Sequence, residues 1–282
     1  MILIADSGST KTEWRLLSDK PTPADTCITK GINPFYQTSA EIHELLKEEY
    51  TLNSFKPQEI HFYGAGCANE EKNNIVKEAL VAYFGIQNIT IESDLTGAAR
   101  ALCQKEEGIA CILGTGSNSC HYNGQDVTAN VSPLGFIIGD EGSGAVLGKK
   151  LIGDILKNQL PQSIITLFFQ EYQTDRAEIL DHIYKKAFPN RYLAQFTKFL
   201  SKHIHLTELE TLVIDSFNEF IKRNILQYNN AENLKVSFTG SIAHHFKPQL
   251  LTALSKNNLT PGIINPAPMD GLAQYHNRTK SL

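Results

Sequence analysis

The sequence predicts an α/β protein of about two domains, and three observations support this class. The chain has 282 residues, and ~150 residues per domain is a common size. Short apolar runs that are typical of buried strands alternate with longer segments of helical periodicity in both halves of the chain. With 41% hydrophobic and 20% charged residues, the chain has the composition of a folded protein with a sizeable core.

The first half opens with a predicted hairpin. Residues 2–5 and 13–17 form its two strands, and the turn between them is rich in Gly, Ser and Thr. Further along, apolar residues such as Val76, Ala79 and Leu80 recur at the spacing of an amphipathic helix. The remaining elements expected in this half are helices over 39–50, 69–84 and 96–104, and strands over 60–64, 89–92 and 109–113.

The second half repeats the alternation of strand, turn and helix. It opens with a glycine turn over 114–118, followed by a helix over 145–156, a mostly helical stretch over 163–228 and a strand over 234–238. No internal repeat is evident from the residues alone. We expect two domains, 1–113 and 114–267, and a C-terminal helix over 268–282 is a candidate addition to the first.

Charge and composition argue against several classes of partner. The formal net charge is −4 and no long basic stripe is present, so nucleic acid is not expected as a partner. The N-terminus lacks the pattern of a signal peptide, and no apolar stretch reaches ~18 residues, so no membrane span is expected. The five cysteines form no CxxC pair, which favours reduced thiols in a cytoplasmic protein.

Three short turns share one plan, because each follows an apolar strand and consists of Gly, Ser and Thr. They are Asp6-Ser7-Gly8-Ser9-Thr10-Lys11, Gly114-Thr115-Gly116-Ser117-Asn118 and Thr239-Gly240-Ser241. Glycine lets the backbone approach a ligand and point successive N–H groups at anionic oxygens, above all phosphate. Each turn taken alone could simply reverse the chain. Three of them at strand ends favour a nucleotide.

Two common nucleotide motifs are absent, since the chain has neither Gly-x-x-x-x-Gly-Lys-Ser/Thr nor Gly-x-Gly-x-x-Gly after a first strand. Acidic residues do occur at element ends: Asp6, Asp94, and the pair Asp140 and Glu141. Phosphoryl transfer needs oxygen ligands for a divalent cation and often a base for the attacking hydroxyl. For Asp94 the alternative role is that of a helix N-cap, and position alone does not separate the two.

These motifs resemble those of N-acetylglucosamine kinases, which belong to the BadF/BadG/BcrA/BcrD-type ATPase superfamily. The resemblance spans about residues 1–272 and is weakest over 155–230. The motifs that carry it are Asp6-Ser-Gly-Ser-Thr-Lys-Thr, Ser93-Asp94-Leu-Thr-Gly-Ala-Ala, Leu113-Gly-Thr-Gly-Ser-Asn118, Gly139-Asp-Glu-Gly-Ser143 and Thr239-Gly-Ser-Ile-Ala243. The resemblance implies two actin/hexokinase-like (ribonuclease H-like) domains flanking a cleft for ATP and substrate.

The resemblance also implies a set of roles for an ATP-dependent sugar kinase. ATP would bind at Ser7, Gly8, Ser9, Thr10, Lys11, Thr115, Gly116, Gly240 and Ser241. An amino sugar, with N-acetylglucosamine phosphorylated at its 6-position as the first expectation, would bind at Asn33, Asp94, Ser117, Asn118, Gly135 and Asp140. Asp94 would be the base, and Asp6 would help to hold Mg²⁺ through water. A homodimer is a family-level expectation.

Other functions remain as alternatives. One is an ATPase that activates a 2-hydroxyacyl-CoA dehydratase-like enzyme, although no cysteine here lies in a cluster-type motif. A non-catalytic nucleotide sensor is another, and a kinase for glucosamine or N-acetylmuramic acid is a third. The segment Ser132-Pro133-Leu134-Gly135-Phe136 departs from the glycines and Trp of vertebrate members, and this loop is expected to contact the sugar.

Overall fold

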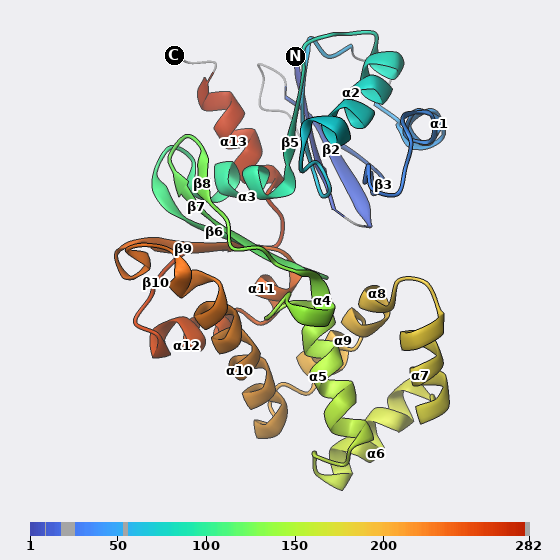
Figure 1. The fold of residues 1–282 in the computed structure, drawn as a ribbon, viewed down its shortest axis with the longest axis vertical. Coiled ribbons are helices and arrows are strands. Elements are labelled where there is room, and N and C mark those ends of the chain that lie inside the picture. The colour runs from blue at the N-terminus through green and yellow to red at the C-terminus, as the bar shows by residue number, and fades with distance from the viewer. Residues whose placement is uncertain (9, 18–25, 53–55, 280–282) are drawn as a thin grey trace. The chain divides into compact units, whose positions relative to one another are not determined.

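The computed structural model describes residues 1–8, 10–17, 26–52 and 56–279. The chain divides into two compact units. The first contains Met1–Glu106, Asn123–Val127 and Ala267–Leu282, and the second contains Glu107–Tyr122 and Thr128–Pro266. Each unit is an α/β structure with its own five-stranded sheet (Figure 1).

The first unit has a mixed sheet with the strand order β3-β2-β1-β4-β5. Its strands are β1 Ile2–Ser7, β2 Lys11–Leu17, β3 Thr26–Lys30, β4 Glu59–Gly64 and β5 Ile89–Ser93. Strand β2 lies antiparallel between β1 and β3, whereas β4 and β5 run parallel to β1. The parallel register places the carboxyl ends of β1, β4 and β5 at one edge of the sheet, where Ser7, Gly64 and Ser93 are neighbours.

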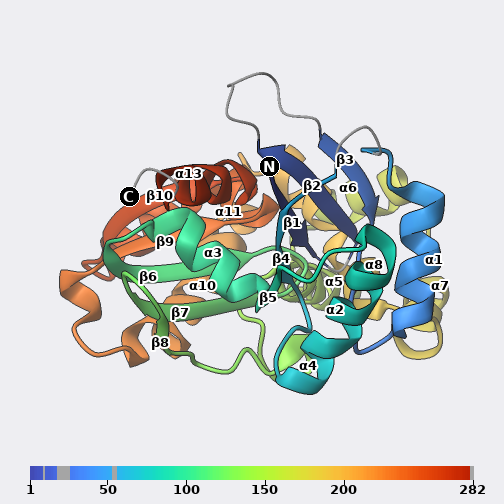
Figure 2. The ribbon, with the colours of Figure 1, turned by 90° about the horizontal axis from the view of Figure 1, so that it is seen from above.

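Two helices cover each face of this sheet (Figures 1 and 2). Helices α1 (Ser39–Glu49) and α2 (Glu70–Phe84) pack on one face over a core that contains Trp14 and Phe62. Helices α3 (Asp94–Cys103) and α13 (Met269–Thr279) pack on the other. Thr38 begins α1 with a capping box, because its side chain accepts from the backbone of Glu41 and the Glu41 side chain accepts in return.

The second unit has a sheet with the order β10-β9-β6-β7-β8. Its strands are β6 Glu107–Leu113, β7 Ser117–Asn123, β8 Val127–Ala129, β9 Lys235–Thr239 and β10 Thr260–Asn265. Strand β9 lies parallel to both β6 and β10. Taken from the opposite edge, this order is β8-β7-β6-β9-β10, which matches the first sheet strand for strand. The chain therefore contains a topological repeat that its residues do not reveal.

Helices make up most of the second unit. They are α4 Gly135–Ile138, α5 Gly144–Leu156, α6 Gln162–Tyr172, α7 Arg176–Lys185, α8 Pro189–Ala194, α9 Thr197–Lys202, α10 Thr207–Arg223, α11 Ser241–His245 and α12 Lys247–Lys256, with short 3-10 turns at Ile225–Gln227 and Ala231–Asn233. A continuous apolar core joins them to the sheet, and seven fully buried phenylalanines lie within it: Phe168, Phe196, Phe199, Phe217, Phe220, Phe238 and Phe246.

The α/β class is confirmed, and the expected helices lie within two residues of their observed bounds at most ends. Strands β3, β7, β8 and β10 were not predicted, because they are short or polar and lack the apolar runs by which the other strands are recognised. In the described part of the chain, no helix is both long and apolar enough to cross a membrane.

Candidate active site

The first turn, between β1 and β2, is fixed from inside by the Ser7 side chain. The Ser7 hydroxyl lies 2.8 Å from the Thr12 hydroxyl, donates to the Ile32 carbonyl and accepts from the Ile32 N–H. It is fully buried, so Ser7 could offer a ligand only its backbone. Gly8, Thr10 and Lys11 are exposed, and the Gly8 N–H closes the turn on the Lys11 carbonyl. Ser9 lies outside the described residues.

Asp6 and Asp94 form an acidic pair in the first unit. Asp6 lies near the end of β1, and Asp94 is the first residue of α3, directly after β5. Burial and the neighbouring Asp94 raise the pKa of Asp6 to about 7. Burial also raises the pKa of Asp94, against hydrogen bonds from nearby backbone N–H groups. Two carboxyl groups that are costly to ionise together provide a place for a cation or a proton.

The helix-cap alternative for Asp94 is wrong, because Ser93 is the N-cap of α3. The Ser93 hydroxyl accepts from the Thr96 N–H at 3.1 Å and lies 3.0 Å from the Thr96 hydroxyl. Ser is among the preferred N-cap residues because its side-chain oxygen reaches the free N–H groups of the first turn. Asp94 lies one position inside the helix, so its carboxylate is not needed as the cap.

Asn33 lies against a fourth glycine turn that was not predicted as part of the site. This turn, Gly64-Ala65-Gly66-Cys67, follows β4 as the other turns follow their strands. A Cβ at Gly66 would lie 2.4 Å from the Asn33 Oδ1 atom, so only glycine allows this contact. The Ala65 N–H donates to the Ser7 carbonyl at 2.8 Å and joins the turn to the first one. The sequence feature by which this turn could have been recognised is an apolar strand followed by Gly-x-Gly.

The second turn, between β6 and β7, is seated on the first residues of α5. The N–H groups of Gly144 and Ala145 donate to the carbonyls of Gly114 and Thr115, and the Ser143 hydroxyl caps α5 through the Val146 N–H. A Cβ at Gly114 would meet no atom within 4 Å. The backbone of this turn therefore has open space beside it for a ligand.

Asp140 packs directly against the second turn. Its carboxylate accepts from the Ser117 N–H at 3.3 Å, and a Cβ at Gly116 would lie 3.1 Å from one of its oxygens. Burial raises the pKa of Asp140 to about 6. Its backbone φ of 54° lies in the left-handed region, which a non-glycine residue adopts at some cost in energy. Such strain is common at functional sites.

The neighbouring polar residues are held by the fold. The Asn118 side-chain oxygen accepts from Asn130 and from the Ser119 N–H, both at 2.9 Å. Glu141 is committed to Arg223, whose Nε lies 2.7 Å from its carboxylate. Glu141 therefore forms a structural ion pair, and Asp140 is the carboxylate that contacts the second turn.

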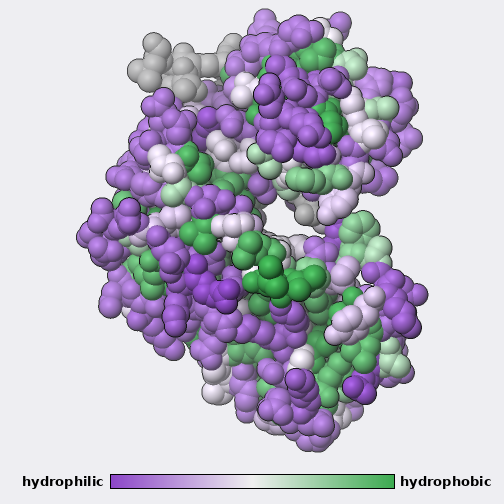
Figure 3. Space-filling model, in the orientation of Figure 1, coloured by the Kyte–Doolittle hydropathy of each residue, from purple (hydrophilic) through white to green (hydrophobic). Residues whose placement is uncertain are grey.

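The segment before Asp140 exposes hydrophobic side chains. Leu134, Ile137 and Ile138 are each more than half exposed, at 57%, 75% and 66%, and Figure 3 shows a hydrophobic patch over α4. The Lys149 ammonium holds this short helix by donating to the Phe136 carbonyl at 2.6 Å. Gly135, at the start of α4, is exposed beside the patch. The segment thus presents apolar groups near Asp140 in the chain.

The third turn lies beside the second within the same unit. Gly240 has a φ of 118°, and a Cβ there would lie 2.3 Å from the Leu113 carbonyl at the end of β6. The Gly240 N–H donates to the Asn265 carbonyl, and Ser241 begins α11. The structure therefore brings Gly116, Ser117, Asp140 and Gly240 into one unit, and Asp6, Asp94 and Asn33 into the other.

No group of three or more His, Cys, Asp or Glu residues suited to hold a metal ion occurs among the described residues. A cavity of about 370 Å³ in the first unit is lined by none of the residues predicted for the site. The candidate site is thus defined by its turns and carboxylates.

The topology and the strand-end turns define a two-domain sugar-kinase fold of the actin/hexokinase type. The chain matches a ROK-family glucokinase from Streptomyces griseus, solved with glucose and AMPPNP, with a TM-score of 0.57 over 99% of this chain and 100% of that one. The sequence identity is 13%, so this likeness shows the fold alone. No protein-family model matches the chain.

Closer relatives identify the family. A structure from Porphyromonas gingivalis, of a protein assigned as an N-acetylglucosamine kinase, is 44% identical with a TM-score of 0.95 and covers 99% of this chain and 100% of its own. The N-acetylmuramic acid/N-acetylglucosamine kinase of Clostridium acetobutylicum is 27% identical over 143 residues, which span 49% of this chain and 46% of that protein. The chain belongs to the N-acetylglucosamine kinase family.

Proposed function

We propose that this protein transfers the γ-phosphoryl group of ATP to a hydroxyl of an amino sugar, with the 6-hydroxyl of N-acetylglucosamine as the first candidate. The observation that carries the proposal is the 44% identity, over the whole chain, to the Porphyromonas gingivalis protein assigned as an N-acetylglucosamine kinase. None of the five cysteines is in a disulfide and four of them are buried, which accords with a cytoplasmic protein. A homodimer stays a family-level prediction.

The second and third turns would hold ATP. The open space beside Gly114 suits a phosphate, whose oxygens could accept from the backbone N–H groups of the turn. The close approach of Gly240 to Leu113 brings the third turn next to the second, as one extended ligand would require. In the first unit, the exposed Thr10 and Lys11 carry donors that suit phosphate oxygens, and Gly8 has no side chain to hinder the approach of a phosphate.

Asp94 would accept the proton of the attacking hydroxyl. Its elevated pKa, caused by burial, brings its basicity closer to neutral pH than that of an ordinary carboxylate. Since Ser93 already caps α3, the Asp94 carboxylate is available for this role. The protein would otherwise act by positioning and by stabilising charge, because the phosphoryl-transfer transition state is loose.

Asp6 is the proposed partner of Mg²⁺, through water. Carboxylate oxygen is the ligand type that Mg²⁺ prefers, and the ion usually keeps several waters. The pKa of about 7 for Asp6 reflects burial beside Asp94, a cost that a nearby cation would offset. When bound, the ion would neutralise charge on the phosphates. The Asp6 carboxylate therefore suits Mg²⁺, and its proposed role is to hold the hydrated ion.

A coupled assay of ADP release tests the proposal, using N-acetylglucosamine, glucosamine, N-acetylmuramic acid and glucose with ATP and Mg²⁺. Release should depend on the sugar and favour N-acetylglucosamine over glucose, because a site built to hydrogen-bond a group rejects an analogue without it. Coupling between phosphorus and sugar protons in the NMR spectrum of the product identifies the phosphorylated hydroxyl. ATP hydrolysis that is indifferent to every sugar would reject the kinase and favour the dehydratase-activating ATPase.

N-acetylmuramic acid is a second candidate acceptor. It is favoured by the name of the Clostridium acetobutylicum relative and by the exposed Leu134, Ile137 and Ile138, which could contact a bulkier sugar. A kcat/KM for N-acetylmuramic acid within tenfold of that for N-acetylglucosamine would establish dual specificity. A value a hundredfold lower would restrict the protein to the smaller sugar.

A further inference from the structure

One face of the first sheet is polar where two helices cover it. By the pairing register, His61 lies beside Thr90 and Tyr63 beside Glu92 on β4 and β5, and Glu59 precedes His61 on the same face. Helices α3 and α13 pack on this face. A sheet face covered by helices is ordinarily apolar, so a row of polar side chains beneath them needs a separate explanation.

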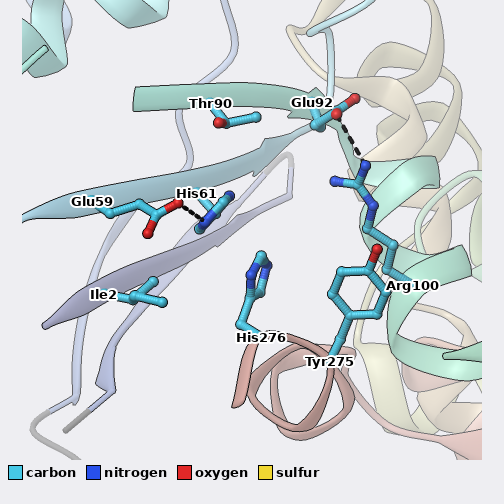
Figure 4. Close-up of a pocket in the computed structure, with 8 residues that line it drawn as sticks. All are labelled: Ile2, Glu59, His61, Thr90, Glu92, Arg100, Tyr275 and His276. Atoms are coloured by element: carbon cyan, nitrogen blue, oxygen red, sulfur yellow. Dashed lines mark ion pairs between the residues drawn. The ribbon is translucent and has the colours of Figure 1, made fainter. Parts of the chain in front are cut away.

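All of these residues except Tyr63 line a cavity of about 370 Å³. Figure 4 shows the side chains around it, contributed by three strands and by both helices. On one side, His61 Nε2 lies 2.9 Å from Glu59, and the ring of His61 lies 4.0 Å from that of His276. On the other, Arg100 lies 3.3 Å from Glu92. The volume falls within the range of small-molecule sites, roughly 300–1,000 Å³.

Two nitrogen atoms of the lining residues lack hydrogen-bond partners: Nδ1 of His61 and Nε of Arg100, both buried. Burial lowers the pKa of His61, so the ring is neutral at neutral pH. With Nε2 donating to Glu59, Nδ1 is left as an acceptor. The Nε–H of Arg100 is a donor. Both atoms are shielded from solvent, so they add to the polar character of the wall, and an occupant of the cavity would contact the accessible atoms of the same side chains.

The charges of the wall select among occupants. Glu59 and Glu92 disfavour a phosphate or another dianion, whereas Arg100 and the nearby Lys105, which lies over the Tyr275 ring at 4.3 Å, disfavour a metal cation. Hydroxyl groups can donate to the carboxylates of Glu59 and Glu92 and can accept from Arg100 and Thr90. A neutral compound with several hydroxyls therefore satisfies both kinds of wall group.

We propose that this cavity is a second, non-catalytic binding site for an uncharged polyhydroxy compound of monosaccharide size. This binding site is proposed independently of the proposed kinase activity. It is connected to the candidate active site through α3, because Arg100 lies on the helix that begins at Asp94. Gly97 of the same helix packs so closely on Tyr63 that a Cβ would lie 2.9 Å from the Tyr63 side chain. An occupant that hydrogen-bonds to Arg100 would therefore contact α3, a helix that packs closely against β4.

The test is backbone-amide NMR of the full chain titrated with N-acetylglucosamine, glucose and myo-inositol. At least one should shift the amides of Thr90, Arg100 and His276 together with others of α3, in a saturable manner. Because myo-inositol lacks a hydroxymethyl group, shifts with it separate this cavity from the proposed acceptor site. Glycine and inorganic phosphate, a zwitterion and an anion, should leave these amides unmoved.

Two variants of Thr90 sharpen the test. Thr90→Val removes one hydroxyl at nearly constant size and should weaken binding roughly 2–10-fold, the effect of one hydrogen bond. Thr90→Phe fills the cavity and should abolish binding. Thr26→Val, the same change at an exposed position of β3 in the same sheet, is the matched control and should bind normally. If Thr90→Phe fails to fold, Thr90→Val decides.

The outcomes are distinct. Shifts confined to residues outside the cavity, or shifts unaffected by Thr90→Val, overturn the site. Saturable shifts with glycine or phosphate and none with the three polyols overturn the assigned chemistry. Loss of kinase activity in the sugar panel with intact cavity shifts would reject the proposed function alone.

Discussion

Replacing Asp94 by Asn separates catalysis from folding at α3. Asn has nearly the size of Asp but cannot accept the proton of the acceptor hydroxyl. General acid–base catalysis contributes on the order of 10²–10⁴-fold, so we expect kcat to fall by about that factor. The affinity for ATP should change little, since the proposed phosphate contacts lie in the glycine turns.

The structure also fixes the expected effect on stability. Ser93, not Asp94, caps α3, so Asp94→Asn should not cost the ~1 kcal/mol of a lost cap. Asn removes a favourable interaction of a carboxylate with the helix N-terminus, about 0.3–1 kcal/mol. It also removes a carboxyl whose ionisation is opposed by burial, as its raised pKa indicates. The two effects oppose each other, so the melting temperature should stay nearly constant.

Ser93→Ala is the matched control, because it removes the cap and keeps the carboxylate. It should lower the free energy of unfolding by about 1 kcal/mol, which corresponds to roughly 2–4 °C in melting temperature for a unit of this size. The assays are initial rates of ADP release and thermal unfolding followed by circular dichroism. Near-normal kcat in a stable Asp94→Asn protein would refute Asp94 as the base and make Asp140 the next candidate.

Three further outcomes follow from close contacts and pKa shifts. Gly116→Val should abolish or severely weaken ATP binding in a folded protein, measured by nucleotide titration, because even a Cβ would lie 3.1 Å from an Asp140 oxygen; unchanged affinity would show that the turn only reverses the chain. Gly97→Ala should destabilise the first unit by about 1–3 kcal/mol in urea unfolding, the usual effect of overpacking, since its Cβ would lie 2.9 Å from Tyr63; a neutral effect would mean that α3 can shift freely. Burial lowers the pKa of His276 to about 3, so its contribution to stability is complete above its unfolded pKa of ~6.5 and is lost as pH falls towards 3, by up to ~1.4 kcal/mol per pH unit. The urea midpoints measured at pH 7 and pH 5 should therefore differ more for the native protein than for His276→Gln. An equal difference in the two proteins would refute the assignment.

The sequence predicted those parts of the fold in which local pattern and tertiary burial agree. Strands β1 and β6 contain apolar runs bounded by turns, and helix α2 has its buried residues at helical spacing. Strand β3 alternates instead between buried and exposed positions at a sheet edge. Strand β10 carries Pro261 and a shift in register before Ile264. Pairing with a neighbour, which no local pattern encodes, makes these segments into strands.

The candidate site could be predicted at the level of turns but not of side-chain roles. Glycines at strand ends are visible in the sequence because they have few other reasons to recur there. Whether Ser7 faces a ligand depends on Thr12 and on the distant Ile32, which occupy its hydroxyl. The polar row of Glu59, His61 and Tyr63 alternates with apolar residues on β4. Such alternation indicates a strand with one solvated face, and only the packing of α3 and α13 shows that helices cover it.

The topological repeat explains why the turns lie where they do. In each unit the hairpin turn follows the central strand, β1 or β6, and a second glycine turn follows the parallel neighbour, β4 or β9. Carboxyl ends of parallel strands share one edge of a sheet, so the two turns in a unit must be neighbours. The hydrogen bond from Ala65 to Ser7 shows this in the first unit, and the close approach of Gly240 to Leu113 shows it in the second. The same architecture then carries different side chains in its two copies: Asp6 and Asp94 lie at the carboxyl ends of β1 and β5 in the first unit, whereas Asp140 packs against the glycine turn after β6 in the second.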